Sequence, residues 1–163
     1  MPIFSCLRTL LAIGILAAVP ALSAAPASSQ APTWAGRHDC QFIVPAEWQD
    51  SRVIWDGACA AGKANGQGVL RGYRKAASTR LFFGQMKHGE LNLGVIEEDD
   101  GYIAGEFVGG AVVPNPERNT LIKAFESASG AAKALGQRLK QTKNASSSAY
   151  YLRKAQELEQ QMD

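Results

Sequence analysis

The sequence contains few of the residues that usually carry catalysis or hold metals. Its 163 residues include two histidines, His38 and His88, and three cysteines. Neither histidine lies in a recognisable nucleophile motif, and His88 precedes Gly89 at an expected hairpin tip, which gives a catalytic group little support. Neither Cys40 nor Cys59 belongs to two matching pairs of ligands at the spacing of a metal site, and His38, two residues before Cys40, is weak evidence by itself. We therefore expect no enzyme activity, no metal and no cofactor.

Long hydrophobic runs are also scarce. Arg8 is followed by the apolar run 10–22 and then by Ser23-Ala24-Ala25, which is the pattern of a secretory signal peptide. The run is shorter than the roughly 20 residues that a membrane span needs. We predict a signal peptide at 1–24, cleaved after Ala24 or Ala25, and a flexible tether at 25–33. Because no second span follows, we expect the mature protein in the periplasm or outside the cell.

The few cysteines agree with export. Removing the signal peptide also removes Cys6 and leaves Cys40 and Cys59, an even pair for an oxidising compartment. We predict that they form a disulfide, closing a loop of about 20 residues and contributing about 3 kcal/mol. The alternative is two unpaired, buried thiols.

Neither sign of charge dominates. The chain has 17 Lys and Arg against 15 Asp and Glu, a formal net charge of +2. Nucleic-acid binding needs a concentrated basic face with stacking aromatics, which we do not find, so no nucleic-acid partner is expected. The basic cluster comprises Arg71, Arg74, Lys75 and Arg80. It is interpreted as a solvated loop with two strand ends, or alternatively as the contact to an anionic surface.

Glycine, by contrast, is abundant, with 16 copies, and it recurs in a lattice. In three segments a large apolar residue, a spacer and a glycine are followed five residues later by a second glycine: Trp55, Gly57 and Gly62; Phe82, Gly84 and Gly89; Ile103, Gly105 and Gly110. Cys59, Met86 and Phe107 stand two residues after each first glycine. The spacing predicts stacked antiparallel hairpins over 34–113.

The lattice also predicts how the hairpins pack. A glycine beside an aromatic residue lets the ring of a neighbouring hairpin lie on bare backbone. We expect Trp55, Phe82 and Ile103 to form one apolar ladder, with Cys59, Met86 and Phe107 on the same side. Core packing is the favoured role of these aromatics, and a ligand-binding groove is the alternative.

Asp100-Gly101 predicts the clearest turn, because a type I′ loop needs positive φ at both positions. On this interpretation the acidic run 97–100 forms a solvated hairpin tip.

After Pro114 the pattern becomes helical, and a helical segment is predicted over 116–163. Asn115 is expected to cap a helix that begins at Pro116. A heptad seam typical of coiled coils follows at Leu121, Phe125, Ala128, Ala132, Leu135 and Leu139. Residues 144–148 interrupt it, and a second stripe comprises Tyr151, Ala155, Leu158 and Met162. A helical hairpin and one long kinked helix both fit this pattern.

The first lattice unit, residues 55–69, resembles a membrane occupation and recognition nexus (MORN) repeat. Gly57, Gly62, Gly66 and Gly68 stand at the family's glycine positions, and Cys59 occupies the second aromatic position, as in similar exported versions. The second unit retains Gly84 and Gly89, and the third retains Gly105, Phe107 and Gly110. The resemblance implies a twisted sheet of hairpins that serves as a scaffold for protein association. Whether Trp34 starts a further, degenerate repeat stays open.

Together these patterns predict an α+β chain, in which an antiparallel, MORN-like hairpin sheet precedes C-terminal α-helices. The predicted function is an exported, non-enzymatic interaction module. A protein partner, or a second copy, would bind the helices through Leu121, Phe125, Leu135 and Leu139. The alternative is a peripheral binder of envelope lipid or anionic polysaccharide that uses the basic cluster.

Overall fold

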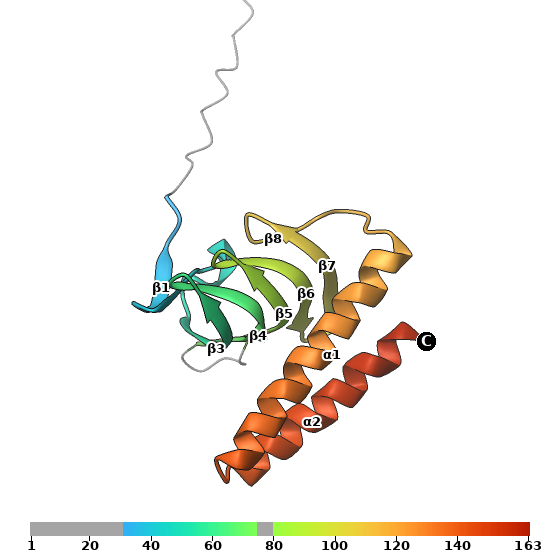
Figure 1. Cartoon of the computed structure of the whole chain (residues 1–163). Coiled ribbons are helices and arrows are strands. Elements are labelled where there is room, and N and C mark those ends of the chain that lie inside the picture. The colour runs from blue at the N-terminus through green and yellow to red at the C-terminus, as the bar shows by residue number, and fades with distance from the viewer. Residues whose placement is uncertain (1–30, 75–79) are drawn as a thin grey trace, which may run out of the picture. The chain divides into compact units, whose positions relative to one another are not determined.

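The computed structural model describes residues 31–74 and 80–163 (Figure 1). Its strands are β1 (Trp34–Arg37), β2 (Cys40–Ile43), β3 (Arg52–Ala60), β4 (Lys63–Tyr73), β5 (Arg80–Lys87), β6 (Glu90–Glu98), β7 (Gly101–Val108) and β8 (Ala111–Val112). Its helices are η1 (Ala46–Trp48), α1 (Arg118–Gln141), α2 (Ala145–Glu159) and η2 (Gln160–Met162). The predicted signal peptide, most of the tether and Lys75 lie outside the described residues.

The fold is α+β: a curled, mixed sheet is followed by two C-terminal helices that pack on it (Figure 1). The strand order is β1-β2-β4-β5-β6-β7-β8, and β3 pairs with β4. The prediction of a purely antiparallel sheet was wrong, because β2 runs parallel to β4, with Gln41 opposite Lys63. β2 crosses the hairpin tips, where the Gln41 and Ile43 amides donate to the carbonyls of Gly62 and Gly89 at 2.9 and 2.7 Å.

Three hairpin loops share one backbone geometry. Ala61-Gly62, His88-Gly89 and Gly109-Gly110 have positive φ at both loop residues, as a type I′ turn requires. The second glycine of each lattice unit therefore lies at the second loop position. The turn predicted at Asp100-Gly101 was misplaced by one residue: Glu98 pairs with Gly101, which begins β7, and the loop is Asp99-Asp100.

The first glycines of the lattice lie in one row across the sheet. Paired in order along this row are Gly57, Gly68, Gly84, Gly94 and Gly105. A parallel row comprises Trp55, Leu70, Phe82, Ile96 and Ile103. The predicted ladder residues Trp55, Phe82 and Ile103 therefore lie in this row but do not pair directly, because β4 and β6 lie between their strands. Ile103, at the end of the row, is 38% exposed.

The aromatic rings of the second row cover the glycines of the first. A Cβ on Gly68 would lie 2.6 Å from the Trp55 ring, and one on Gly94 would lie 2.9 Å from the Phe82 ring. Each ring therefore lies on its own hairpin, β3–β4 or β5–β6, rather than on a neighbouring hairpin as expected. Because glycine has no Cβ, the rings can approach the backbone this closely.

The two faces of the sheet carry separate cores. The helix face, defined by Val69, Leu81, Phe83 and Val95, packs against α1 and α2. The opposite inner face includes Leu70, Phe82, Met86, Ile96 and Phe107, and Phe42 and Trp48 from β2 and η1 join it. Both elements precede β3 in the chain and were not assigned to the core by the lattice pattern.

The helices form an antiparallel hairpin, which excludes the single kinked helix (Figure 1). Asn144 caps α2 by accepting from the Ser147 amide at 3.3 Å. The predicted cap at Asn115 was wrong: α1 begins after Glu117, whose carbonyl accepts from the Thr120 amide at 2.9 Å. Asn115 instead adopts φ 53° and turns the chain from β8 towards the helix.

The heptad seam of α1 does not serve a coiled coil within the described residues. The seam alanines Ala128 and Ala132, and the neighbouring Ala124 and Ala131, are buried against the sheet and α2, where small side chains allow close approach. The helices themselves meet at Gly136, where a Cβ would lie 2.9 Å from Leu152 Cγ. Ser148 Oγ also donates to the Gly136 carbonyl at 2.8 Å.

A buried ion pair joins α2 to β6. Lys154 Nζ lies 2.7 Å from Glu97 Oε1 and 2.6 Å from Glu157 Oε2. Burial by itself lowers the pKa of Lys154, but its bonds to the two carboxylates outweigh that effect and hold the pKa above its ordinary value. Glu97 is therefore part of the helix–sheet contact and not of the solvated tip predicted for the acidic run.

Candidate functional site

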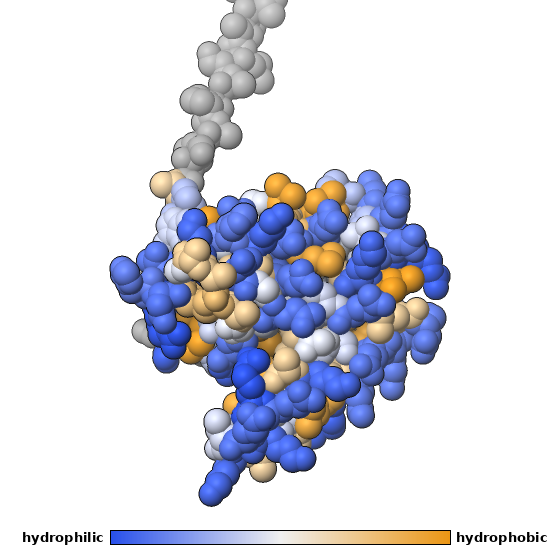
Figure 2. Space-filling model, in the orientation of Figure 1, coloured by the Kyte–Doolittle hydropathy of each residue, from blue (hydrophilic) through white to orange (hydrophobic). Residues whose placement is uncertain are grey.

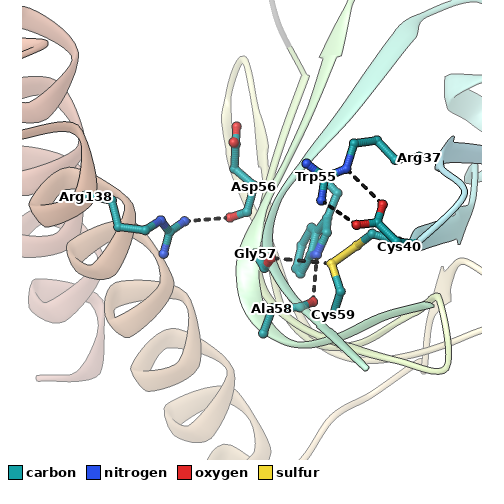
Figure 3. The surroundings of a disulfide bond; sticks show 9 residues. Arg37, Cys40, Trp55, Asp56, Gly57, Ala58, Cys59 and Arg138 are labelled. Carbon is teal, nitrogen blue, oxygen red and sulfur yellow. Dashed lines mark hydrogen bonds and ion pairs between the residues drawn. A yellow bond between two sulfur atoms is a disulfide. The ribbon is translucent and has the colours of Figure 1, made fainter. Parts of the chain in front are cut away.

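An open groove of about 690 Å³ lies beside the disulfide, and Figure 3 shows the surroundings of that bond. The groove is lined by Gly36 and Arg37 of β1, Cys40 and Phe42 of β2, residues 52–59 of β3, Gln67 of β4 and Arg138 of α1. Its volume lies within the range of ligand pockets in proteins. We call it the β3 groove.

The disulfide fixes one end of the β3 groove. Cys40 of β2 is bonded to Cys59 of β3, as predicted, with 5.5 Å between the two Cα atoms. Cys40 is 6% exposed, whereas Cys59 lies at the surface. The bond ties the β1–β2 hairpin to β3 at a point where these elements do not pair as strands.

The groove follows a strand edge that has no strand partner. β3 pairs with β4 along one edge, and within 31–74 and 80–163 no strand pairs with its other edge. Arg138 reaches from α1 to donate to the Asp56 carbonyl at 3.0 Å (Figure 3). On the other side of β3, Trp55 Nε1 donates to the Ala58 carbonyl at 3.1 Å. Two side chains thus donate to backbone carbonyls of β3, one from α1 and one from β3 itself.

The charges that line the groove are mostly positive. Arg37, Arg52 and Arg138 oppose a single carboxylate, that of Asp56, and Asp56 already forms an ion pair with Arg71 of β4. Burial lowers the pKa of Arg71, but the Asp56 charge helps to raise it above the ordinary value, so Arg71 keeps its charge. Arg37 bonds Asp39 at 3.1 Å on an exposed surface, where such a pair contributes little.

The basic cluster predicted from the sequence is not a set of free cations. Arg71 pairs with Asp56, and Arg74 and Arg80 lie 3.8 and 3.5 Å from the Asp50 carboxylate. Arg80 also donates to the Glu47 carbonyl. Arg71 therefore joins β4 to β3, whereas Arg74 and Arg80 join the ends of β4 and β5 to the segment around η1.

Three of the four helix residues predicted to bind a partner, Phe125, Leu135 and Leu139, contact this chain's own core. Leu135 is 3% exposed between helices and sheet, and Phe125 and Leu139 pack against the same core. The Phe125 ring lies edge-on to Tyr102 of β7, with 5.8 Å between centroids. Leu121 is partly buried. Partner binding by these residues stays a prediction.

The predicted lattice residues take three kinds of position. Phe82, Met86 and Phe107 are at most 3% exposed in the inner core, and Trp55 packs partly buried against it. Gly62, Gly89 and Gly110 form the hairpin loops, and Gly66 pairs with Met86. Arg37, Arg52 and Arg138, which line the groove, carry no motif and were not singled out from the sequence.

The two histidines do not form a site with acidic or sulfur neighbours. His38 and His88 are exposed in hairpin loops, and His88 borders a second hollow of about 210 Å³ with Lys87, Phe107 and Val108. Within the described ranges, no group of three potential metal ligands comes together. None of the helices placed in those ranges is long and apolar enough to cross a membrane.

The view in Figure 2 shows a largely hydrophilic face, on which hydrophobic side chains form small, separate groups. No family model, curated protein or solved structure matches the chain. The likeness to MORN repeats therefore rests on the glycine and aromatic positions alone.

Proposed function

We propose that the chain is an exported, non-enzymatic protein-interaction module whose partner binds in the β3 groove. The observation that carries this proposal is a groove of about 690 Å³ that follows an unpaired strand edge of nine residues. Such an edge presents backbone donors and acceptors to a partner chain. The glycine row and the disulfide support this role, because they hold the groove walls in a fixed arrangement.

We further propose that the sheet is MORN-like. The three lattice units place their second glycines at equivalent loop positions, and their first glycines share one row. These features support a common structural unit. The parallel β2 strand and the curl of the sheet are additions to a simple hairpin array.

Export is proposed from the signal-peptide pattern, and the disulfide supports it, since such bonds persist in oxidising compartments. Binding to lipid or polysaccharide is the less supported alternative. It would use Arg71, Arg74 and Arg80, whose charges are already matched by Asp56 and Asp50. Partner binding through the helices would require side chains that now pack on the sheet.

Capture from an envelope extract tests the proposed function. The mature chain is immobilised beside a variant in which Arg37 and Arg138 of the groove are both replaced by alanine, and beside a control with the exposed Arg118 and Arg153 replaced instead. We expect a protein retained at high salt by the mature chain and the control, but not by the groove variant. Equal retention by all three, or retention of lipid alone, would refute the proposal. The helices are kept throughout because they share a core with the sheet.

A further inference from the structure

The free edge of β3 has the form of a peptide-binding site. The groove is lined by residues 52–59 without interruption, so a chain lying in it would contact nearly the whole of β3. An extended segment can add to such an edge through main-chain hydrogen bonds, which give affinity without requiring a particular sequence.

Resting on the proposed interaction function, we propose that the partner presents an extended segment with carboxylate side chains, which adds to β3 as a further strand. The lining charges decide the chemistry of the segment: three arginines face the groove, and its one carboxylate is already paired. Complementary charge favours an acidic segment and disfavours a basic one.

Arg138 is the residue on which the proposed recognition depends most. Its guanidinium lines the groove and is held there by a 3.0 Å bond to the Asp56 carbonyl. An arginine guanidinium carries five N–H donors, so the same side chain can bind a carboxylate of the peptide while it keeps this bond.

A second copy of this chain is a poorer occupant. In an antiparallel pairing of two β3 edges centred on Asp56, Arg138 of one copy would lie near Arg138 of the other, and like charges at an interface oppose association. The β1–β2 hairpin, fixed to β3 by the disulfide, also borders the groove that a second sheet would have to enter.

The probes are capped nine-residue peptides, matched to the nine residues of β3, in which threonine alternates with aspartate. In one control peptide lysine replaces aspartate. Two others carry N-methyl groups on one or the other alternate set of backbone amides. Only one of these sets faces β3 in an added strand, so we expect one methylated peptide to bind as the parent does and the other not to bind.

Binding is measured by titration calorimetry with the full mature chain, and amide exchange locates it. We expect the aspartate peptide to bind and to slow exchange in β3, and the lysine peptide not to bind. Arg138→Ala should weaken binding about tenfold, as expected for loss of a charged hydrogen bond, whereas Arg153→Ala on the exposed face of α2 should have no effect. Equal urea midpoints would show that both variants fold.

Three outcomes would overturn the inference. The first is equal binding of both methylated peptides, which excludes strand addition. The second is a dimer, detected by sedimentation, that is lost when a residue at the free edge of β3 is replaced by proline. This result would assign the edge to a second copy. The third is no peptide binding while envelope-protein capture still depends on Arg37 and Arg138, in which case the proposed function stands without this partner. Failure of both peptide binding and capture would remove the proposed function as well.

Discussion

The Trp55 ring packs on the backbone of Gly68 so closely that a Cβ on Gly68 would lie 2.6 Å from ring atoms Cζ2 and Cη2. Gly68 pairs with Gly57 on β3 and with Gly84 on β5, so it is the central contact between two hairpins. The ring is held in place by the bond from its Nε1 to the Ala58 carbonyl. Trp55 also lines the β3 groove, and the glycine row and the candidate site therefore share one wall.

Gly68→Ala should destabilise the fold by about 3 kcal/mol, because the added methyl overpacks a site between backbone and a fixed ring. Urea denaturation measures the change. Gly130→Ala is the matched control: it lies in α1, and its Cβ would meet only the end of the Gln67 side chain, at 3.1 Å. That variant should be neutral or more stable by up to about 1 kcal/mol, from helix propensity. Equal losses in the two variants would refute the close packing.

Phe82→Ala should cost about 4 kcal/mol, since Phe82 is 0% exposed and its ring contacts Phe107 edge-on, with 5.6 Å between centroids. Trp55→Ala should cost about half as much, because Trp55 is only partly buried. The two variants are compared by their free energies of unfolding in urea. A larger loss for Trp55→Ala would mean that the groove wall, rather than the inner core, dominates stability.

The glycine and aromatic spacing predicted the hairpins and the cross-strand row that contains Trp55, Phe82 and Ile103. The disulfide was predicted separately, from the even pair of cysteines in an exported chain. Spacing acts locally through backbone geometry, so hairpins can be predicted from it. The parallel pairing of β2 and the burial of Trp48 could not be predicted in this way. Both depend on which part of the curled sheet the chain packs against. The Asn115 cap failed for a related reason: the turn out of β8 uses that residue at positive φ, and the helix begins only after Glu117.

The groove was harder to predict than the fold. Its arginines come from β1, β3 and α1, and Arg37 and Arg138 are about 100 residues apart in the sequence. No local motif joins them. The heptad seam of α1 gave the correct apolar face, but a seam does not specify what covers it, and the sheet of the same chain covers it here.

Reducing the Cys40–Cys59 bond should lower the free energy of unfolding by about 3 kcal/mol, because the bond closes a loop between residues 19 apart. Thermal melts with and without a phosphine reductant should show a clear loss in midpoint. In the control, both cysteines are replaced by alanine, and the melt should then be the same with and without reductant. An unchanged midpoint for the native chain would mean that the β1–β2 hairpin is held by packing alone.

Stability should fall as the pH rises above 10, and Tyr151 is one of the residues that cause the decline. Its side chain is buried between α2 and the sheet, with 6.4 Å between its centroid and that of Phe83. Burial raises the pKa of Tyr151 from 10.0 to about 12, although the nearby Arg71 charge acts in the opposite direction. The unfolded chain therefore loses this proton first, and the contribution of neutral Tyr151 is present below pH 10 and lost between pH 10 and 12.

Urea unfolding between neutral pH and pH 11 tests this sign. Tyr151→Phe should be less stable at neutral pH if the hydroxyl makes a favourable contact, but its stability should decline less steeply above pH 10. Tyr73→Phe is the control, because Tyr73 is 38% exposed at the end of β4; its decline should stay close to that of the native protein. A parallel decline in all three proteins would mean that the Tyr151 hydroxyl ionises as easily in the fold as in the unfolded chain, and that the helix–sheet core admits water at this position.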